Sequence, residues 1–158
     1  NVCGLKDAHT TEVDAKTPNP IITTMPEQLV NIKEKKMGGS MRLGAYPCRL
    51  VKNSVARSLY GKDLISERHR HRYEVNNDYI KDLEQNGLRI SGIHPIKSRK
   101  AGTAKQLFNR VNPQLSLVEI IELPEHKFFV ATQFHPELKS RPLNPHPLFL
   151  GFIKASAK

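Results

Sequence analysis

A histidine and a glutamate two positions apart carry the clearest chemical signal in the chain. His135 and Glu137 lie in the segment Gln133-Phe134-His135-Pro136-Glu137, directly after an apolar run typical of a buried strand. Pro136 restricts His135 to an extended conformation, in which residues two apart point to the same side. The Glu137 carboxylate can therefore hold one ring nitrogen of His135, and the other nitrogen can act as a general base for a nucleophile. A purely structural histidine would show the same pattern, as would a metal-binding histidine oriented by a carboxylate, although no further metal ligands cluster nearby in the sequence.

A second group of polar residues forms the run Arg68-His69-Arg70-His71-Arg72. Guanidinium groups pair bidentately with carboxylates and phosphates, so this run could bind an anionic group. Nucleic acid could use the same residues, but Tyr73 is the one aromatic neighbour, which is little for a base-stacking surface. The alternative is a solvated basic strand.

Composition places the chain among globular proteins of one domain. It has 158 residues, 38% of them hydrophobic, and a formal net charge of +10 that favours anionic partners. No apolar run approaches the ~20 residues of a membrane span, and no signal peptide pattern opens the chain, so we expect a cytoplasmic protein with no membrane contact. The two cysteines, Cys3 and Cys48, form no CxxC pair and are expected to be free thiols.

Apolar periodicity and turn residues predict an α/β protein. Residues 1–5 have the pattern of the end of a helix, and the proline-containing residues 14–28 that of loop and short extended pieces. Strands are expected over residues 41–51, 67–76, 88–92, 117–123 and 128–134. Further helices are expected over residues 54–60, 77–85 and 147–157. The strands 117–123 and 128–134 are expected to form an antiparallel pair.

A basic insert, residues 94–116, separates two of these strands. It contains five basic residues and no acidic one: Lys97, Arg99, Lys100, Lys105 and Arg110. Because unpaired charges are costly to bury, we expect a mobile surface excursion between two strands that remain paired.

Five segments in order resemble the glutaminase domain of the CTP synthase family. They are residues 38–44, 67–76, 117–124, 128–137 and 146–152. The resemblance covers nearly the whole chain apart from the insert. It is specific, because other Cys-His-Glu amidotransferases share the His-Pro-Glu element but not the run Arg-His-Arg-His-Arg-Tyr-Glu-Val-Asn.

The resemblance implies an α/β, class I glutamine amidotransferase (flavodoxin-like) fold, with a mixed central sheet flanked by helices. Residues 1–158 would be the C-terminal portion of that domain. The family hydrolyses L-glutamine with a Cys-His-Glu triad and passes ammonia to a synthetase domain, where ATP-activated UTP becomes CTP in pyrimidine nucleotide biosynthesis. His135 and Glu137 match the base and its orienting carboxylate. Glu12 matches the residue that holds the glutamine α-ammonium, and Arg72, with the Tyr73 backbone beside it, the residue that takes the α-carboxylate.

The sequence departs from the family at the nucleophile. The family's nucleophile lies in a Gly-x-Cys-Leu-Gly turn, which is not in this sequence. Cys3 aligns with the helix after that turn and Cys48 with a later strand, so neither is the nucleophile. The chain is therefore expected to be part of a larger enzyme and inactive alone.

The resemblance also implies partners. They are the N-terminal synthetase domain, with ATP and Mg²⁺ bound there, GTP as an allosteric activator, and a homotetramer. No metal or cofactor is expected in residues 1–158, and for GTP only the turn at residues 41–44 suggests a contact. The alternative is a basic module that binds nucleic acid or a nucleotide through Arg68, Arg70, Arg72 and the insert. Such a module has no need of an acid opposite its arginines, so Glu12 favours the enzyme. We further expect Arg72 and Glu12 to share a cleft with His135 and Glu137 at its mouth.

Overall fold

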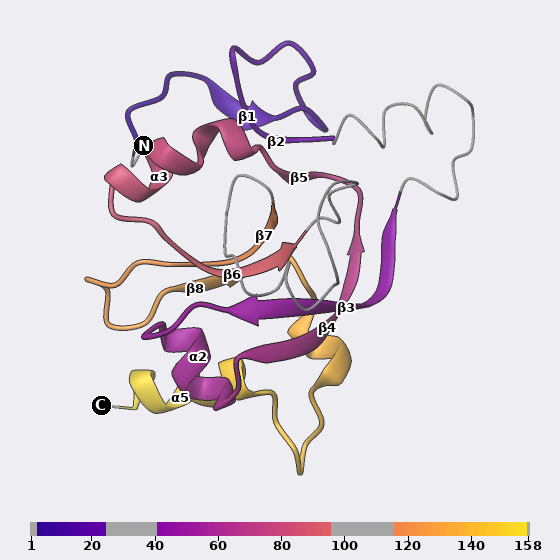
Figure 1. Ribbon diagram of the computed structural model, residues 1–158, viewed down its shortest axis with the longest axis vertical. Coiled ribbons are helices and arrows are strands. Elements are labelled where there is room, and N and C mark those ends of the chain that lie inside the picture. Colours follow the sequence, from indigo (N-terminus) through magenta and orange to yellow (C-terminus); the bar gives the residue numbers. More distant parts are fainter. Residues whose placement is uncertain (1–2, 25–40, 96–115, 158) are drawn as a thin grey trace, which may run out of the picture.

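The structure is a computed structural model that describes residues 3–24, 41–95 and 116–157 (Figure 1). Strands form most of the regular structure. In chain order the strands are β1 (Ala8–Thr10), β2 (Asn19–Thr23), β3 (Arg42–Leu50), β4 (Leu64–His71), β5 (Glu74–Val75), β6 (Arg89–Pro95), β7 (Ser116–Glu122) and β8 (Val130–Thr132). The helices are α2 (Val55–Tyr60), α3 (Ile80–Gln85) and α5 (Pro147–Ser156), with 3₁₀ turns η2 (Asn77–Tyr79) and η4 (Pro136–Lys139).

The strands form two sheets. The larger has five antiparallel strands in the order β4-β3-β6-β7-β8. The smaller has the order β1-β2-β5, with β1 parallel and β5 antiparallel to β2. In Figure 1 the smaller sheet lies above the larger one.

The larger sheet curls until the chain beyond one edge strand reaches the other edge strand. The backbone N–H of His135, three residues after β8, donates to the carbonyl of Arg68 on β4 at 2.9 Å. Lys139 Nζ donates to the carbonyl of Ser66, also on β4, at 2.5 Å. The curl therefore joins the segment that carries His135 to the strand that leads to Arg72.

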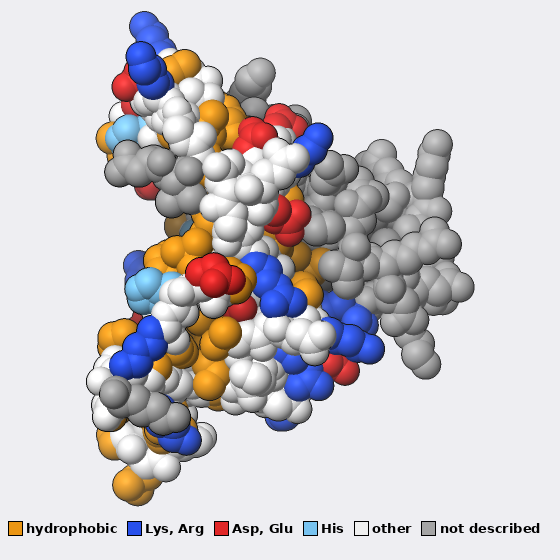
Figure 2. Space-filling model, turned by 90° about the vertical axis from the view of Figure 1, so that its left-hand side faces the viewer, with side chains coloured by type: hydrophobic (Ala, Val, Ile, Leu, Met, Phe, Trp, Pro, Cys, Tyr) orange, Lys and Arg blue, Asp and Glu red, His pale blue; other side chains and the backbone are white. Residues whose placement is uncertain are grey.

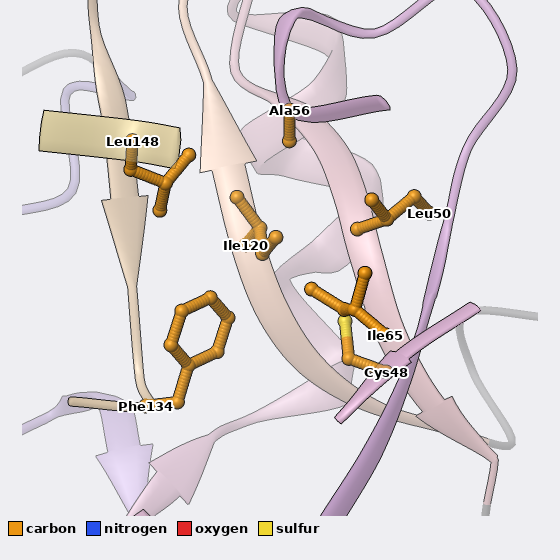
Figure 3. Packing of buried hydrophobic residues seen from close by; sticks show 7 residues of the cluster. All are labelled: Cys48, Leu50, Ala56, Ile65, Ile120, Phe134 and Leu148. Atoms are coloured by element: carbon orange, nitrogen blue, oxygen red, sulfur yellow. The ribbon is translucent and has the colours of Figure 1, made fainter. Parts of the chain in front are cut away.

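Helices α2 and α5 cover one side of the larger sheet, below it in Figure 1. Helix α2 begins at Val55 because the Ser54 side chain accepts a hydrogen bond from the backbone N–H of Arg57. The helices approach closely at Gly151, where a Cβ atom would lie 2.7 Å from Leu59. Seven buried residues fill the core beneath them (Figure 3): Cys48, Leu50, Ala56, Ile65, Ile120, Phe134 and Leu148.

Helix α3 lies on the opposite side of the larger sheet from α2 and α5 (Figure 1). A second apolar cluster packs beneath it, made of Ile80, Ile90, Ile93 and Val118. The sheet is therefore covered on both faces, which confirms the α/β class.

Most predicted elements are confirmed within one or two residues. Strands β3, β6 and β7 lie at residues predicted as strand, and β7 pairs antiparallel with both β6 and β8. The predicted helix 54–60 is α2, the predicted helix 147–157 is α5, and the predicted helix 77–85 is the turn η2 followed by α3.

The strand predicted over residues 67–76 is two strands, β4, which ends at His71, and β5, and they belong to different sheets. Strand β6 extends beyond its predicted end at residue 92, to Pro95.

Two other predicted elements need correction. Residues 3–5 are not helical: Cys3 is in a turn, and Gly4 has a left-handed φ of 65°, which an α-helix does not accept. The strand predicted over residues 128–134 is limited to Val130–Thr132. Its first residues belong to the turn, where the Phe128 N–H donates to His126 Nδ1.

The basic insert is mostly outside the described residues. Residues 94 and 95 end β6 and residue 116 begins β7, so the two flanking strands do pair as expected. Residues 96–115, which contain all five basic side chains, are not described. Among the described helices, none is both long and apolar enough to cross a membrane.

Candidate active site

The predicted pair of His135 and Glu137 is present. His135 Nδ1 lies 2.7 Å from Glu137 Oε1, and because a carboxylate only accepts, Nδ1 carries the proton. The neutral ring then presents Nε2 as an acceptor, and no described residue hydrogen-bonds to it. The Glu137 backbone N–H and the His135 ring both donate to the Glu137 carboxylate and hold its pKa below the ordinary value. This ring can accept a proton at Nε2.

Local sequence explains how the pair is presented. Phe134 is buried in the core, and its carbonyl accepts a hydrogen bond from Thr132 Oγ1 at 3.0 Å. The chain then turns at Pro136, the first residue of η4, which brings Glu137 back beneath His135. The two side chains are 38% and 56% exposed, so a ligand can reach them from solvent. The buried residue Phe134 thus fixes the chain directly before the accessible side chain of His135.

Glu12, Arg72 and Tyr73 line one cavity of about 450 Å³ together with Ile22, Met41, Arg70 and His71. The smaller sheet brings the opposite charges together. Glu12 follows β1 and Arg72 precedes β5, and these two strands flank β2. The cavity is therefore lined by both a carboxylate and a guanidinium group, and the buried Nε of Arg72 has no hydrogen-bond partner among the described residues.

His135 and Glu137 are not among the described residues that line this cavity. What connects the two groups is strand β4: His135 is bonded to the backbone of Arg68, and the same strand runs on to Arg72. That all four side chains serve one ligand therefore stays a prediction.

The arginine-histidine run is an alternating strand rather than a uniform basic surface. On β4 the side chains of Arg68 and Arg70 are exposed, whereas Glu67 and His69 point inward and are buried. His69 Nε2 contacts Glu119 Oε2 at 2.6 Å, with both side chains fully buried. Three residues of this run, Arg70, His71 and Arg72, line the charged cavity, and Arg72 is the one that the resemblance assigned to substrate binding.

Sequence reasoning missed a buried ionic cluster beside the cavity. Arg42 Nη1 lies 2.7 Å from Glu119 Oε1 and 3.2 Å from Glu74 Oε1, and His71 Nε2 lies 3.0 Å from the same Glu74 oxygen. Burial favours the neutral form of Glu119, but the His69 hydrogen bond and the Arg42 charge together hold its pKa below the ordinary value. An acidic residue inside the apolar strand β7 was the signal for this cluster, because charge in a buried strand requires a partner.

The two cysteines lack the features of a catalytic nucleophile. Both are free thiols, as expected. Burial, and then the nearby Glu119 carboxylate, raises the pKa of Cys48 well above its ordinary value, so this thiol stays protonated. Cys3 is only half-buried, and its Sγ lies 3.7 Å from the carbonyl of Asp82 on α3.

Comparison with known proteins shows the family. A sequence model described as "Glutamine amidotransferase class-I" matches residues 20–155. The chain belongs to this family. It is 48% identical over 156 residues to a CTP synthase of Thermococcus gammatolerans and 52% identical over 155 residues to one of Caldanaerobacter subterraneus subsp. tengcongensis. These matches cover 99% and 98% of this chain but only 26% and 25% of the relatives, so the chain spans about a quarter of their length.

A solved structure supports the same assignment. The glutaminase domain of Trypanosoma brucei CTPS, with bound acivicin, superposes with a TM-score of 0.79 at 34% identity. The match covers 99% of this chain and 53% of that domain's chain. The expected class I glutamine amidotransferase fold is therefore confirmed, and the chain corresponds to part of a glutaminase domain.

Proposed function

We propose that this chain supplies the base and the substrate-binding charges of a glutaminase site in a CTP synthase. The observation that carries this proposal is the His135–Glu137 pair, 2.7 Å apart and open to solvent, in a chain about half identical to CTP synthases. The site would hydrolyse L-glutamine to glutamate and ammonia. The ammonia would serve ATP-dependent amination of UTP to CTP, a step of pyrimidine nucleotide biosynthesis.

In this proposal His135 Nε2 takes the proton of a cysteine thiol as the thiolate attacks the glutamine amide carbon, and then gives a proton to the departing ammonia. The γ-glutamyl thioester that remains is hydrolysed by a water molecule, which His135 deprotonates, and this releases glutamate and the free thiol. Glu137 keeps the ring in the Nδ1–H tautomer and stabilises the imidazolium that forms.

Glu12 and Arg72 bind the amino acid end of the substrate. The Glu12 carboxylate receives the α-ammonium, and the Arg72 guanidinium receives the α-carboxylate beside the Tyr73 backbone. Opposite charges that line one cavity suit a zwitterion.

The nucleophilic cysteine would come from another part of the full-length protein. Cys48 is buried and held protonated, and Cys3 lies against α3, which support assigning the nucleophile to neither. The 158-residue chain alone would then release no ammonia from glutamine.

The remaining components belong to the rest of the enzyme. ATP and Mg²⁺ would bind in the synthetase domain, GTP would act as an allosteric activator, and the full protein would form a homotetramer in the cytoplasm. Within the described residues, no group of three or more His, Cys, Asp and Glu side chains is arranged to hold a metal ion.

Nucleic acid is not part of this proposal. On the face shown in Figure 2, acidic and basic side chains are interspersed with apolar ones, whereas a polynucleotide site favours a continuous basic surface.

The experiment compares two nitrogen sources in the full-length protein. CTP formation from UTP and ATP is measured with L-glutamine and, separately, with ammonium chloride, in wild type and in His135→Asn. We expect the variant to lose the glutamine-driven reaction and to keep the ammonium-driven one. Glutamine-driven CTP formation that survives this substitution would refute the proposed role.

A further inference from the structure

Glu74 and Gln133 are in contact, although each belongs to a different end of the proposed site. Glu74 begins β5, two residues after Arg72, and is 1% exposed. Gln133 follows β8, two residues before His135. A contact between them therefore connects the substrate-binding end to the catalytic end.

The Gln133 side chain makes three hydrogen bonds. Its nitrogen donates to Glu74 Oε2 at 2.5 Å and to the carbonyl of Val118 at 3.1 Å, and its oxygen accepts from the backbone N–H of Val75 at 3.2 Å. These partners fix the orientation of the amide, because the reverse orientation would oppose like groups. Gln133 thus joins the larger sheet, through β7, to the smaller sheet, through β5.

The Glu74 carboxylate is itself held on its other oxygen. Arg42 Nη1 donates to Oε1 at 3.2 Å, and His71 Nε2 lies 3.0 Å from the same atom. With Oε2 bonded to Gln133, both oxygens are fixed by buried or half-buried partners. Hydrogen bonds to a charged group are among the stronger ones in proteins, and so Glu74 is a firm anchor.

We propose that Gln133, bonded to Glu74, is a positioning residue that sets the distance between His135 and Arg72. This inference rests on the proposed glutaminase function. The backbone N–H of Gln133 donates to the carbonyl of Glu119 at 3.0 Å, so its side chain adds a second constraint on the segment between β8 and His135. A displacement of a reacting group by about 1 Å can cost on the order of 100-fold in rate, which is the effect such a constraint prevents.

The test separates binding from turnover in the full-length protein. Gln133→Leu removes the three hydrogen bonds but leaves Arg72 and Glu12 on the smaller sheet, where β2 pairs with β5. We expect kcat for glutamine hydrolysis to fall by about 10- to 100-fold. The inhibition constant of L-glutamate, which presents the same α-ammonium and α-carboxylate, should change by no more than about twofold. Gln133→Met, an unbranched side chain of similar length, serves as the second variant if Leu impairs folding.

Gln85→Leu is the matched control, because Gln85 is an exposed amide at the end of α3, away from both ends of the site. It should leave kcat and the glutamate inhibition constant unchanged. Ammonium-driven CTP formation, measured for each variant, reports whether the enzyme is folded.

Only a fall in kcat with an unchanged glutamate inhibition constant supports the inference. If both constants change in parallel, Gln133 is merely structural, and if kcat is unchanged, it positions nothing; either result overturns the inference. Failure of the proposed function has a different signature, since the wild-type protein would then hydrolyse no glutamine or would do so without His135.

Discussion

Two histidine–glutamate pairs in this molecule have nearly the same geometry and different surroundings. His69 and Glu119 lie 2.6 Å apart with both side chains fully buried. His135 and Glu137 lie 2.7 Å apart with side chains 38% and 56% exposed. The first pair is enclosed on all sides by the curled sheet, and the second stands at the end of a strand.

The difference shows that such a pair does not by itself identify a catalytic base. His69 uses both ring nitrogens inside the protein, because Nδ1 also lies 3.0 Å from the carbonyl of Glu67. It has no nitrogen left for a substrate. His135 uses one nitrogen and leaves the other to solvent. Exposure, rather than the pairing distance, separates the two roles.

The strongest test of this comparison substitutes one member of each pair. His135→Asn should lower glutamine hydrolysis by the full-length protein about 10²- to 10⁴-fold, the usual contribution of a general base. Its thermal unfolding should be nearly that of wild type, because an exposed side chain contributes little. Ammonia release measures the loss of glutamine hydrolysis, and calorimetry measures the thermal unfolding. A strongly destabilised His135 variant would show that the pair is structural after all.

A substitution in the buried pair should instead lower the stability of the fold. Glu119→Gln breaks contacts with His69 and Arg42 and is expected to destabilise the glutaminase domain by about 3–5 kcal/mol at pH 7, the usual cost of breaking a buried ion pair.

This loss should depend on pH in a defined direction. The pKa of Glu119 lies below the ordinary 4.5 in the folded protein, so the carboxylate stabilises the fold above pH 4.5 and loses that effect as pH falls through the folded pKa. The difference in unfolding free energy between wild type and variant, measured at pH 7 and at progressively lower pH, should become smaller below about pH 4. A difference of the same size at every pH would exclude an ionic role for Glu119.

Glu137→Gln is expected to have a smaller effect than loss of the histidine. The amide can still hold the ring but cannot neutralise the imidazolium, and we expect glutamine hydrolysis to fall by about 10²-fold, the lower end for acid–base groups. Because the pKa of Glu137 is lowered, its carboxylate is ionised at pH 7, and the full loss of glutamine hydrolysis should be seen there. A variant that keeps wild-type turnover at pH 7 would contradict the assignment.

The smallest effect is expected on the outer side of β4. Arg68→Ala keeps the backbone carbonyl that holds His135, and the exposed side chain should be worth no more than about 0.5 kcal/mol of stability. Glutamine turnover should stay within about twofold of wild type. Binding of labelled RNA that is lost in this variant would instead revive the alternative of a nucleic-acid module.

The sequence was most informative where the determining contacts are local. His135 and Glu137 are two residues apart, and their pairing was predicted correctly, but from an extended chain, whereas the structure forms it through the 3₁₀ turn that begins at Pro136. Helix α2 could be located because its cap, Ser54, adjoins it. The pairing of Glu12 with Arg72 needed the family resemblance, since nothing local connects them.

Long-range contacts account for what was missed. Arg42, Glu74 and Glu119 come from three different strands, and their proximity depends on the order of strands in the sheets. The helical end expected over residues 1–5 does not include residues 3–5, where Gly4 adopts a left-handed conformation, and residues 1–2 lie outside the described part of the chain. The family resemblance predicted the fold, but not which histidines of the arginine-histidine run point inward.

The bond between the His135 N–H and the Arg68 carbonyl also has a consequence for folding. It joins strand β4 to the chain beyond β8, and between them lie β5, α3, β6 and β7. Contacts between residues far apart in sequence form late, because closing a long loop costs entropy before any contact compensates for it. During synthesis, His135 can bond to β4 only after β8, the last strand, has been made. The proposed base therefore reaches its place only once the C-terminal part of the chain has docked against β4.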